Sequence, residues 1–244
     1  SCPICLAGFE ANCPNAKDGV NGGYQGEFYR AINADGALVK IPGQPSDYSD
    51  DQLASLMTLA DVMPTGFHAA KAADVHEGDT VVVFGDGAVG LCAVISAKLL
   101  GAKRIIAMSR HEDRAALARD FGATDIIAER GEEAIQKIMF LTNGYGADAA
   151  LECVGTKQAI ESAFQAVRAG GRVGRVGVPH DVDYNEWIDS LFWKNIQLGG
   201  GVASVARWDK EILLEAVLSG EINPGRVFTA AVSYTHLRAH ETRG

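Results

Sequence analysis

The stretch "TVVVFGDGAVGLCAVISAKLLG", residues 80–101, decides the fold. A continuous β-branched run ends at Gly85, and an apolar segment with helical spacing starts at Ala88. Between them, "GDGAVG" (85–90) matches the pattern G-x-G-x-x-G. A strand that leads through this pattern directly into a helix is typical of a dinucleotide site.

Each glycine of this pattern has an expected task. Gly85 permits the tight turn, Gly87 lets the main chain approach a pyrophosphate, and Gly90 lets the helix pack closely on the strand. The first helical residues, Ala88 and Val89, offer free N–H groups to the phosphates. The alternative is an ordinary strand–helix turn that is rich in small residues.

The same alternation continues downstream of this first unit. Short apolar strands alternate with segments of helical spacing, which predicts βαβ units and a parallel sheet. The expected strands after the first are "RIIAMS", "TDIIA", "ADAALECVG", "RVGRVGVP" and "NIQLGGG" (195–201). The predicted fold class is therefore a doubly wound α/β protein with a six-stranded Rossmann sheet.

The first 60 residues have a different pattern. The cysteine-containing start leads into "GGYQGEFYRAINADGALVKIPG" (22–43), strand-like pieces broken by glycine and without helical period. Such a stretch suits a β region of another domain. Residues 52–73 predict a helix, a break at Pro64 and a second helix, and the domain boundary is placed there.

Four segments follow from this division. Residues 1–62 are expected to be part of a β-rich domain, 63–202 the dinucleotide-binding domain, and 203–231 the start of a return to the first domain. Val232 to Thr242 resembles one reading frame of a sequencing-library adapter, so 232–244 is interpreted as a non-native tail. The alternative is a disordered basic C-terminus, and the two histidines of the tail are not taken as a metal site.

Composition excludes several classes of function. The chain has 244 residues, is 47% hydrophobic and carries a net charge of −9. An acidic chain without a basic cluster disfavours nucleic-acid binding and attraction to anionic membranes. Five cysteines within a long α/β pattern favour metal binding in a reducing compartment over disulfides, so a cytoplasmic location is expected.

The end of the second strand, "RIIAMSRHEDR" (104–114), bears on the choice of dinucleotide. An NAD site normally places Asp or Glu there to hold the ribose 2′-hydroxyl. Ser109 stands in that place and Arg110 follows, so no carboxylate repels a 2′-phosphate and a guanidinium is at hand to bind it. This favours NADP(H) over NAD(H). Ser109 and Glu112 also match a capping box for the next helix, and both readings are compatible.

Several motifs together resemble the zinc-dependent medium-chain alcohol dehydrogenases. They are the spacing C-x2-C-x7-C at the start of the chain, then "DVMPTGFHAA", "VVVFGDGAVG", "ECVG" and "VGVP". The resemblance covers residues 1 to about 231 and implies a GroES-like catalytic domain before the Rossmann domain. It also implies a homodimer or homotetramer acting on a small alcohol or carbonyl compound.

The resemblance implies two zinc sites. Cys2, Cys5 and Cys13 match three of the four cysteines of the family's structural-zinc lobe, and the fourth would precede Ser1. We therefore expect the chain to be a piece of a longer enzyme. Asp61 matches a ligand of the catalytic zinc, whose other ligands would also lie before residue 1; the alternative for Asp61 is a helix-terminal residue that faces solvent.

The resemblance also assigns nicotinamide contacts. Thr65 matches the position that packs against the nicotinamide, although it equally suits a simple N-cap. Val154 and Gly155 match a turn beside the riboses. The segment Val176, Gly177 and Val178 matches main chain that faces the carboxamide; either stretch is otherwise a buried strand end.

The implied reaction is reversible oxidation of an alcohol, with zinc as Lewis acid and hydride transfer to the nicotinamide. Two alternatives stand beside it: a zinc-free quinone or enoyl reductase of the same superfamily, and a dinucleotide-binding module without catalysis. Because most catalytic-zinc ligands would be missing, we expect this chain to bind NADP(H) without turning over alcohol.

Overall fold

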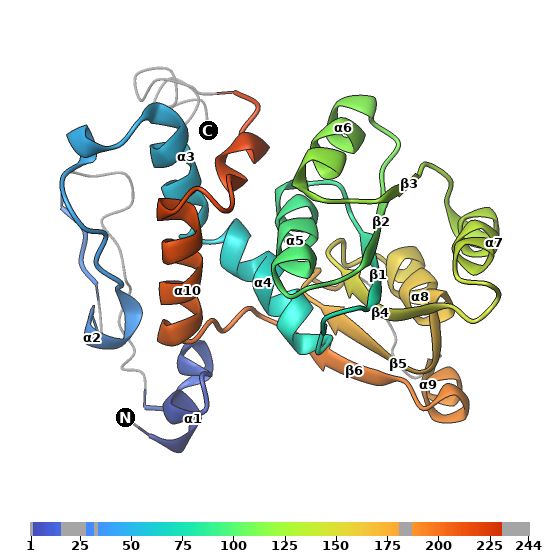
Figure 1. Ribbon diagram of the computed structural model, residues 1–244. Helices are drawn as coiled ribbons and strands as arrows, with labels where there is room; N and C mark the ends of the chain where they lie inside the picture. Colours follow the sequence, from blue (N-terminus) through green and yellow to red (C-terminus); the bar gives the residue numbers. More distant parts are fainter. Residues whose placement is uncertain (1, 16–27, 32–33, 181–186, 231–244) are drawn as a thin grey trace, which may run out of the picture.

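The computed structural model describes residues 2–15, 28–31, 34–180 and 187–230. The expected adapter-derived tail and part of the glycine-rich stretch 22–43 lie outside these residues. The described part has two regions, which Figure 1 shows side by side. One is a sheet covered by helices, and the other gathers the N-terminal segments around α3 and α10.

The sheet is parallel and has six strands in the order β3-β2-β1-β4-β5-β6. This confirms the predicted fold class. The strands are β1 Thr80–Phe84, β2 Arg104–Met108, β3 Asp125–Ile127, β4 Ala147–Glu152, β5 Val167–Arg175 and β6 Gln197–Gly200.

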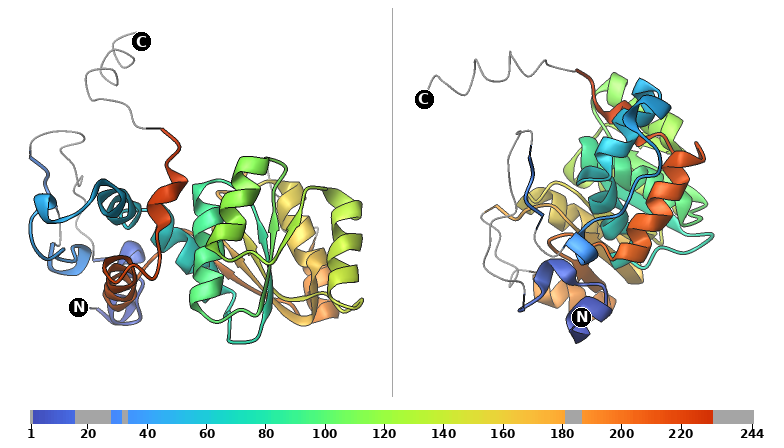
Figure 2. Two further views of the ribbon diagram at one scale, coloured as in Figure 1. Left: turned by 45° about the horizontal axis from the view of Figure 1, so that its top comes forward. Right: turned by 90° about the vertical axis from the view of Figure 1, so that its left-hand side faces the viewer.

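The helices of the sheet region cover both faces, as the turned view in Figure 2 shows. They are α4 Val62–Ala72, α5 Ala88–Leu99, α6 Glu112–Phe121, α7 Gly131–Leu141, α8 Lys157–Ala166 and α9 Ile188–Lys194. Alternate strand residues feed two cores, because side chains of a strand point to opposite faces. Val81 and Val83 pack with α4, α5 and α6, while Val82 and Phe84 pack with α7 and α8.

Helix α4 lies very close to α5. A Cβ added at Gly66 would stand 2.6 Å from the backbone nitrogen of Ala93, so only glycine permits this approach. The predicted break at Pro64 is wrong: α3 ends at Thr58, α4 begins at Val62, and Pro64 lies in the first turn of α4. Proline is tolerated in a first turn because the N–H it lacks has no partner within the helix there.

The second region contains short helical turns and two longer helices. Its elements are α1 Pro3–Leu6, η1 Glu10–Asn12, α2 Ala34–Ala37, η2 Pro45–Asp47, α3 Asp50–Thr58, α10 Arg207–Leu218 and η4 Pro224–Val227. Among the described residues before Asp50 no β-strand is present, only the isolated bridge residue Arg30, which differs from the expected β region. A strand needs a ladder of hydrogen bonds to a neighbouring strand, and the pairing of Arg30 does not extend to its described neighbours. Residues 22–27 and 32–33 of the expected β stretch lie outside the described residues.

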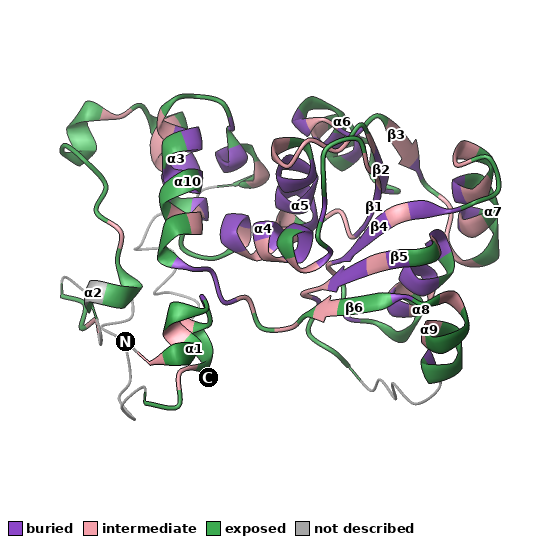
Figure 3. Ribbon diagram, turned by 60° about the horizontal axis from the view of Figure 1, so that its bottom comes forward, coloured by how far each residue is buried: buried purple, intermediate pink, exposed green. Residues whose placement is uncertain are grey.

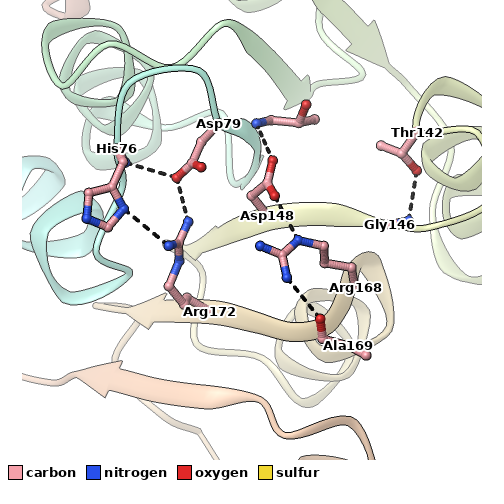
Figure 4. Close-up of polar contacts among 9 residues, drawn as sticks. His76, Asp79, Thr142, Gly146, Asp148, Arg168, Ala169 and Arg172 are labelled. Carbon is pink, nitrogen blue, oxygen red and sulfur yellow. Dashed lines mark hydrogen bonds and ion pairs between the residues drawn. The ribbon is translucent and has the colours of Figure 1, made fainter.

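The two edges of the sheet are built differently. At the amino ends of β1 and β4, charged side chains form a network, drawn in Figure 4. Asp148 accepts hydrogen bonds from the Thr80 nitrogen and from Arg168, both at 2.8 Å. Arg172 pairs with Asp79, and both side chains are only 14% exposed. The carboxyl ends carry glycine-rich main chain instead, and the candidate site lies there.

Candidate functional site

The glycine-rich turn between β1 and α5 has the geometry that its pattern predicts. Gly85 has φ of +118°, a conformation that residues with a side chain rarely adopt. A Cβ at Gly90 would stand 2.0 Å from the carbonyl oxygen of Gly85, whereas a Cβ at Gly87 would meet nothing within 4 Å. The turn is therefore closed on its inner side and open at Gly87.

The N-terminus of α5 faces this open side. Gly87 is the N-cap residue, and no side chain caps the helix end. The first turn contains Ala88 and Val89, both half-buried. An uncapped helix start offers main-chain N–H groups and positive potential to an anion. Together with the open side of Gly87, this arrangement suits a pyrophosphate.

Ser109 directly follows the end of β2 at Met108 but does not form the expected capping box. Its hydroxyl donates to Oδ2 of Asp86 at 2.8 Å and to the carbonyl oxygen of His111 at 3.2 Å. His111 is the N-cap residue of α6, without a side-chain cap. The capping-box interpretation of Ser109 and Glu112 is wrong, because the serine hydroxyl is engaged by the glycine-rich turn.

Positive charge gathers beside Ser109. Arg110 is exposed, and Arg114 donates to Oδ1 of Asp86 at 3.1 Å. Arg130 is half-buried and donates to the carbonyl oxygens of Ala128 at 3.1 Å and Glu129 at 2.8 Å. Burial and then the charge of Arg110 lower the pKa of Arg130. Two arginines at this strand end suit a phosphate group.

The ends of β4 and β5 meet across a tight main-chain contact. A Cβ at Gly155 would stand 1.9 Å from the carbonyl oxygen of Val178, and a Cβ at Gly177 would stand 2.1 Å from the nitrogen of Gly155. Val154 and Val178 are exposed, and Val176 is half-buried. Gly85 lies against Val154, since its added Cβ would be 3.2 Å from that side chain. The structure thus brings residues 85–90, 154–155 and 176–178 together.

A buried carboxyl supports this contact from below. Oε1 of Glu152 accepts hydrogen bonds from the nitrogens of Val154 and Gly155, both at 2.7 Å. Its Oε2 is buried without a hydrogen-bond partner among the described residues. Burial raises the pKa of Glu152, although the two N–H groups and Arg175 oppose the rise.

The three N-terminal cysteines converge. The Sγ atom of Cys2 lies 3.6 Å from that of Cys5 and 3.7 Å from that of Cys13, and all three lie within 4.8 Å of one another. Two thiolates on one tetrahedral zinc, each about 2.3 Å from the metal, stand about 3.8 Å apart. The three thiols therefore fit three corners of a zinc site.

The thiols of this cluster differ in acidity. The backbone N–H of Cys5, followed by side-chain hydrogen bonds from Cys5 and Cys13, lowers the pKa of Cys2 to about 7. Hydrogen bonds with Cys13 and Cys2 raise the pKa of Cys5 to about 11. One thiolate thus forms readily, and a cation would favour the others.

Asp61 and Thr65 lie together at the start of α4. The Thr65 hydroxyl donates to Oδ1 of Asp61 at 3.1 Å, and its nitrogen donates to the carbonyl oxygen of Asp61 at 2.9 Å. Thr65 is inside the first turn, so its interpretation as an N-cap is wrong; Asp61 holds that position, without a side-chain bond to the backbone. The Asp61 carboxylate is exposed, as the alternative of a helix-terminal residue facing solvent also expects, and its role as a metal ligand stays a prediction.

A single cavity of about 1090 Å³ joins Asp61 and Thr65 to the cysteine cluster. Its walls include Cys2, Cys5, Cys13 and the segment 203–205, where the Ser204 hydroxyl donates to the Gly8 carbonyl oxygen at 3.1 Å. None of residues 85–90, 154–155 or 176–178 lines this cavity. The expected site residues therefore form two groups, one at the sheet edge and one around the cavity.

Sequence reasoning missed four residues of the sheet-edge group. Asp86, Arg114, Arg130 and Glu152 are brought there by the fold. Two of them had a signal: Asp86 stands inside G-x-G-x-x-G, and Glu152 is the one charge at the end of an apolar strand. The arginines had none, since they reach the site from α6 and from the segment before α7.

The fold defines a protein of the doubly wound, Rossmann-like α/β class. The family model described as zinc-binding dehydrogenase matches residues 88–211. The chain belongs to this family.

Known relatives extend the comparison. The NADP-dependent isopropanol dehydrogenase of Thermoanaerobacter brockii is 35% identical over 229 residues, which cover 92% of this chain and 61% of the relative. The zinc-dependent alcohol dehydrogenase 2 of Streptococcus pneumonia in its apo form superposes with a TM-score of 0.77 at 29% identity, covering 93% of this chain and 63% of that one. The alcohol dehydrogenase of Thermus sp. ATN1 gives a TM-score of 0.67 at 30% identity, covering 72% and 50%. The chain thus spans about three fifths of the length of the first two.

Proposed function

We propose that this chain provides the dinucleotide site and part of the metal sites of a zinc-dependent, NADP(H)-linked oxidoreductase that interconverts an alcohol and an aldehyde or ketone. The observation that carries the proposal is the sheet edge, where an open glycine turn, an uncapped helix and the two strand ends at 154–155 and 176–178 lie together. The isopropanol and alcohol dehydrogenase names of the relatives support the substrate class.

Each group at the sheet edge has a role in cofactor binding. Main-chain N–H groups of 87–90 hold the pyrophosphate, and Ser109 with Arg110 holds the adenosine ribose and its 2′-phosphate. Val154 and Gly155 border the riboses, while Val176, Gly177 and Val178 present main chain to the carboxamide. The Glu152 carboxylate holds the turn after β4 through its two N–H bonds. Its backbone carbonyl oxygen accepts the nitrogens of Val176 at 2.9 Å and Gly177 at 3.1 Å, which joins this turn to the end of β5.

The metal residues have separate roles. Cys2, Cys5 and Cys13 hold a structural zinc that orders the first turn of the chain. Asp61 would supply one ligand of a catalytic zinc, and the metal when bound would provide Lewis-acid chemistry for the alcohol oxygen. Thr65 orients the Asp61 carboxylate through its hydroxyl and braces the nicotinamide.

Two experiments test this function. Fluorescence titration of NADPH with the 244-residue chain should show saturable binding, while NADP⁺, isopropanol and Zn²⁺ added together should give no NADPH absorbance. We expect no turnover because, among the described residues, we assign only Asp61 to the catalytic metal. This carboxylate lies in the cavity wall beside Thr65. Failure to bind NADPH overturns the proposal, and turnover by this chain refutes its inactivity.

The zinc-free reductase remains the alternative within the superfamily. The 3.6–3.7 Å sulfur spacing favours zinc, since such a reductase has no use for a tetrahedral thiol cluster. Metal analysis after purification in reducing buffer distinguishes the two. A non-catalytic dinucleotide-binding module would show the same binding but no turnover even when the sequence is extended to the relatives' full length.

We further propose a homo-oligomer, because β6 is an edge strand with exposed residues, visible in Figure 3. Leu198 and the nearby Val202, Phe192 and Trp193 are exposed large apolar side chains beside this edge. Unpaired strand edges readily pair with another chain.

We place the domain boundary at residues 62/63 and the return of the chain at 203–231.

None of the described helices has the length and apolar character to cross a bilayer. A cytoplasmic location is proposed because the cysteine cluster binds metal only when reduced.

A further inference from the structure

The glycine-rich turn carries an acidic side chain at its second position. Asp86 stands between Gly85 and Gly87, and its side chain is 17% exposed. Oδ2 accepts the Ser109 hydroxyl at 2.8 Å, and Oδ1 accepts Arg114 at 3.1 Å. The carboxylate is thus held in one orientation by partners from β2 and α6.

This orientation brings the carboxylate into contact with the residue at which an NAD site has its own carboxylate. In such sites an Asp or Glu at the end of the second strand binds the ribose 2′-hydroxyl. Here Ser109 occupies that strand end, and Asp86 reaches to within one hydrogen bond of it. The charge that the sequence lacks at residue 109 is therefore supplied from the neighbouring turn.

The carboxylate is ionised at neutral pH. Burial raises the pKa of Asp86, but hydrogen bonds from Ser109 and Arg114 outweigh burial and lower it below its usual range. The positive charge of Arg114 acts in the same direction. A 2′-phosphate, which carries about two negative charges, would meet this anion at close range.

We propose that Asp86 is a specificity-determining residue that accepts the adenosine ribose 2′-hydroxyl and lowers the preference for NADP(H) over NAD(H). Arg110 and Arg130 attract a 2′-phosphate, while Arg114 is occupied by Asp86 and contributes less. The chain accordingly accepts both dinucleotides. This inference rests on the proposed function only in requiring that a nicotinamide dinucleotide binds at the sheet edge.

The test compares the dissociation constants of NADPH and NADH for the 244-residue chain and its variants. Asp86→Asn keeps the shape and removes the charge, and Asp86→Ala also removes the acceptor. The ratio of the NADPH constant to the NADH constant should fall about tenfold in both variants, with tighter NADPH binding. Asp113→Asn removes one charge from an exposed residue of α6 and should change the ratio less than about twofold.

The outcomes are distinguishable from those of the proposed function. If both dinucleotides bind and the ratio changes less than about threefold in both Asp86 variants, or rises, this inference fails alone. If neither dinucleotide binds the unsubstituted chain, the proposed function and this inference both fail. If Asp86→Ala does not fold, Asp86→Asn decides the result, with circular dichroism as the folding control.

Discussion

The sheet edge and the cavity beside the cysteines use opposite means to build a site. At the sheet edge the site is made mainly of main chain, because Gly85, Gly90 and Gly155 let neighbouring segments approach one another closely. Around the cavity, side chains of Cys2, Cys5, Cys13 and Asp61 carry the chemistry. The glycine turn 85–90 and the cysteine cluster are each specified by a short local stretch. Joining the turn to the ends of β4 and β5, or Asp61 to the cavity of the cysteines, depends on residues distant in sequence.

The largest expected effect breaks the sheet edge at its tightest contact. Gly90→Ala would force a Cβ to within 2.0 Å of the Gly85 carbonyl oxygen, so the turn must shift. We expect the free energy of unfolding, measured with urea, to fall by about 3 kcal/mol. Dinucleotide affinity should fall at least about tenfold.

Gly87→Ala is the matched control for this change. Its added Cβ meets nothing within 4 Å, so the free energy of unfolding should stay within about 0.5 kcal/mol. NADPH binding should still weaken, because the methyl group stands where the pyrophosphate approaches. Equal stability of the Gly90 and Gly87 variants would contradict the close-contact argument.

The second effect separates the two edges of the sheet. Arg172→Gln removes the ion pair with Asp79 at the amino edge, where both side chains are 14% exposed. Urea unfolding should show a loss of about 2 kcal/mol. NADPH affinity should change less than about twofold, because the network does not reach the carboxyl edge.

The exposed ion pair of Arg119 with Glu112 provides the comparison. Arg119→Gln should cost less than about 0.5 kcal/mol, since solvent screens an exposed pair. The two edges would be coupled if the Arg172 variant lost more free energy of NADPH binding than free energy of unfolding.

The third effect tests the cavity region. Cys5→Ser should lower the affinity of the chain for Zn²⁺ at least about tenfold, measured by competition with a chromophoric chelator. NADPH affinity should not change. Cys92→Ala is the control: Cys92 is buried in the core, burial raises its pKa to about 12, and its loss should leave Zn²⁺ affinity intact.

The smallest effect concerns Glu152 and the pH. Because burial raises its pKa, the folded chain binds this proton more tightly than the unfolded chain does. The free energy of unfolding therefore falls with rising pH over a limited range. The range begins at the pKa of the carboxyl in the unfolded chain, about 4.3, and ends where the carboxyl of the folded chain also ionises. Glutamine does not titrate, so Glu152→Gln should gain stability relative to the unsubstituted chain between pH 4.5 and neutral pH. A difference that is constant with pH would show that the carboxyl ionises equally in both states.

The sheet was predictable from sequence, and the reason is local. In β1 and β2, runs of apolar residues without alternation indicate strands buried on both faces, and Val81 to Phe84 are buried in the structure. The turn 85–90 was predictable because its glycines act within six residues. The strand end at Ser109 was also found, but not the partner of its hydroxyl.

What escaped sequence reasoning depends on contacts between distant elements. Asp86 and Ser109 are 23 residues apart, and their hydrogen bond exists only because β1 and β2 lie side by side. The helix break was misplaced because Pro64 is compatible with a first turn. The β region was expected from glycine-broken apolar pieces, which also occur in irregular chain.

The contact of Gly66 with the Ala93 backbone has a consequence for motion between the two regions. Main chain packed against main chain leaves no side chain to rearrange, so α4 has to travel with α5 and the sheet as one body. Any opening of the cavity therefore has to bend the chain at both passages between the regions: at Leu59–Asp61, between α3 and α4, and at 201–206, between β6 and α10. Asp61 would then swing at the first of these passages, while Thr65 stays fixed relative to the dinucleotide.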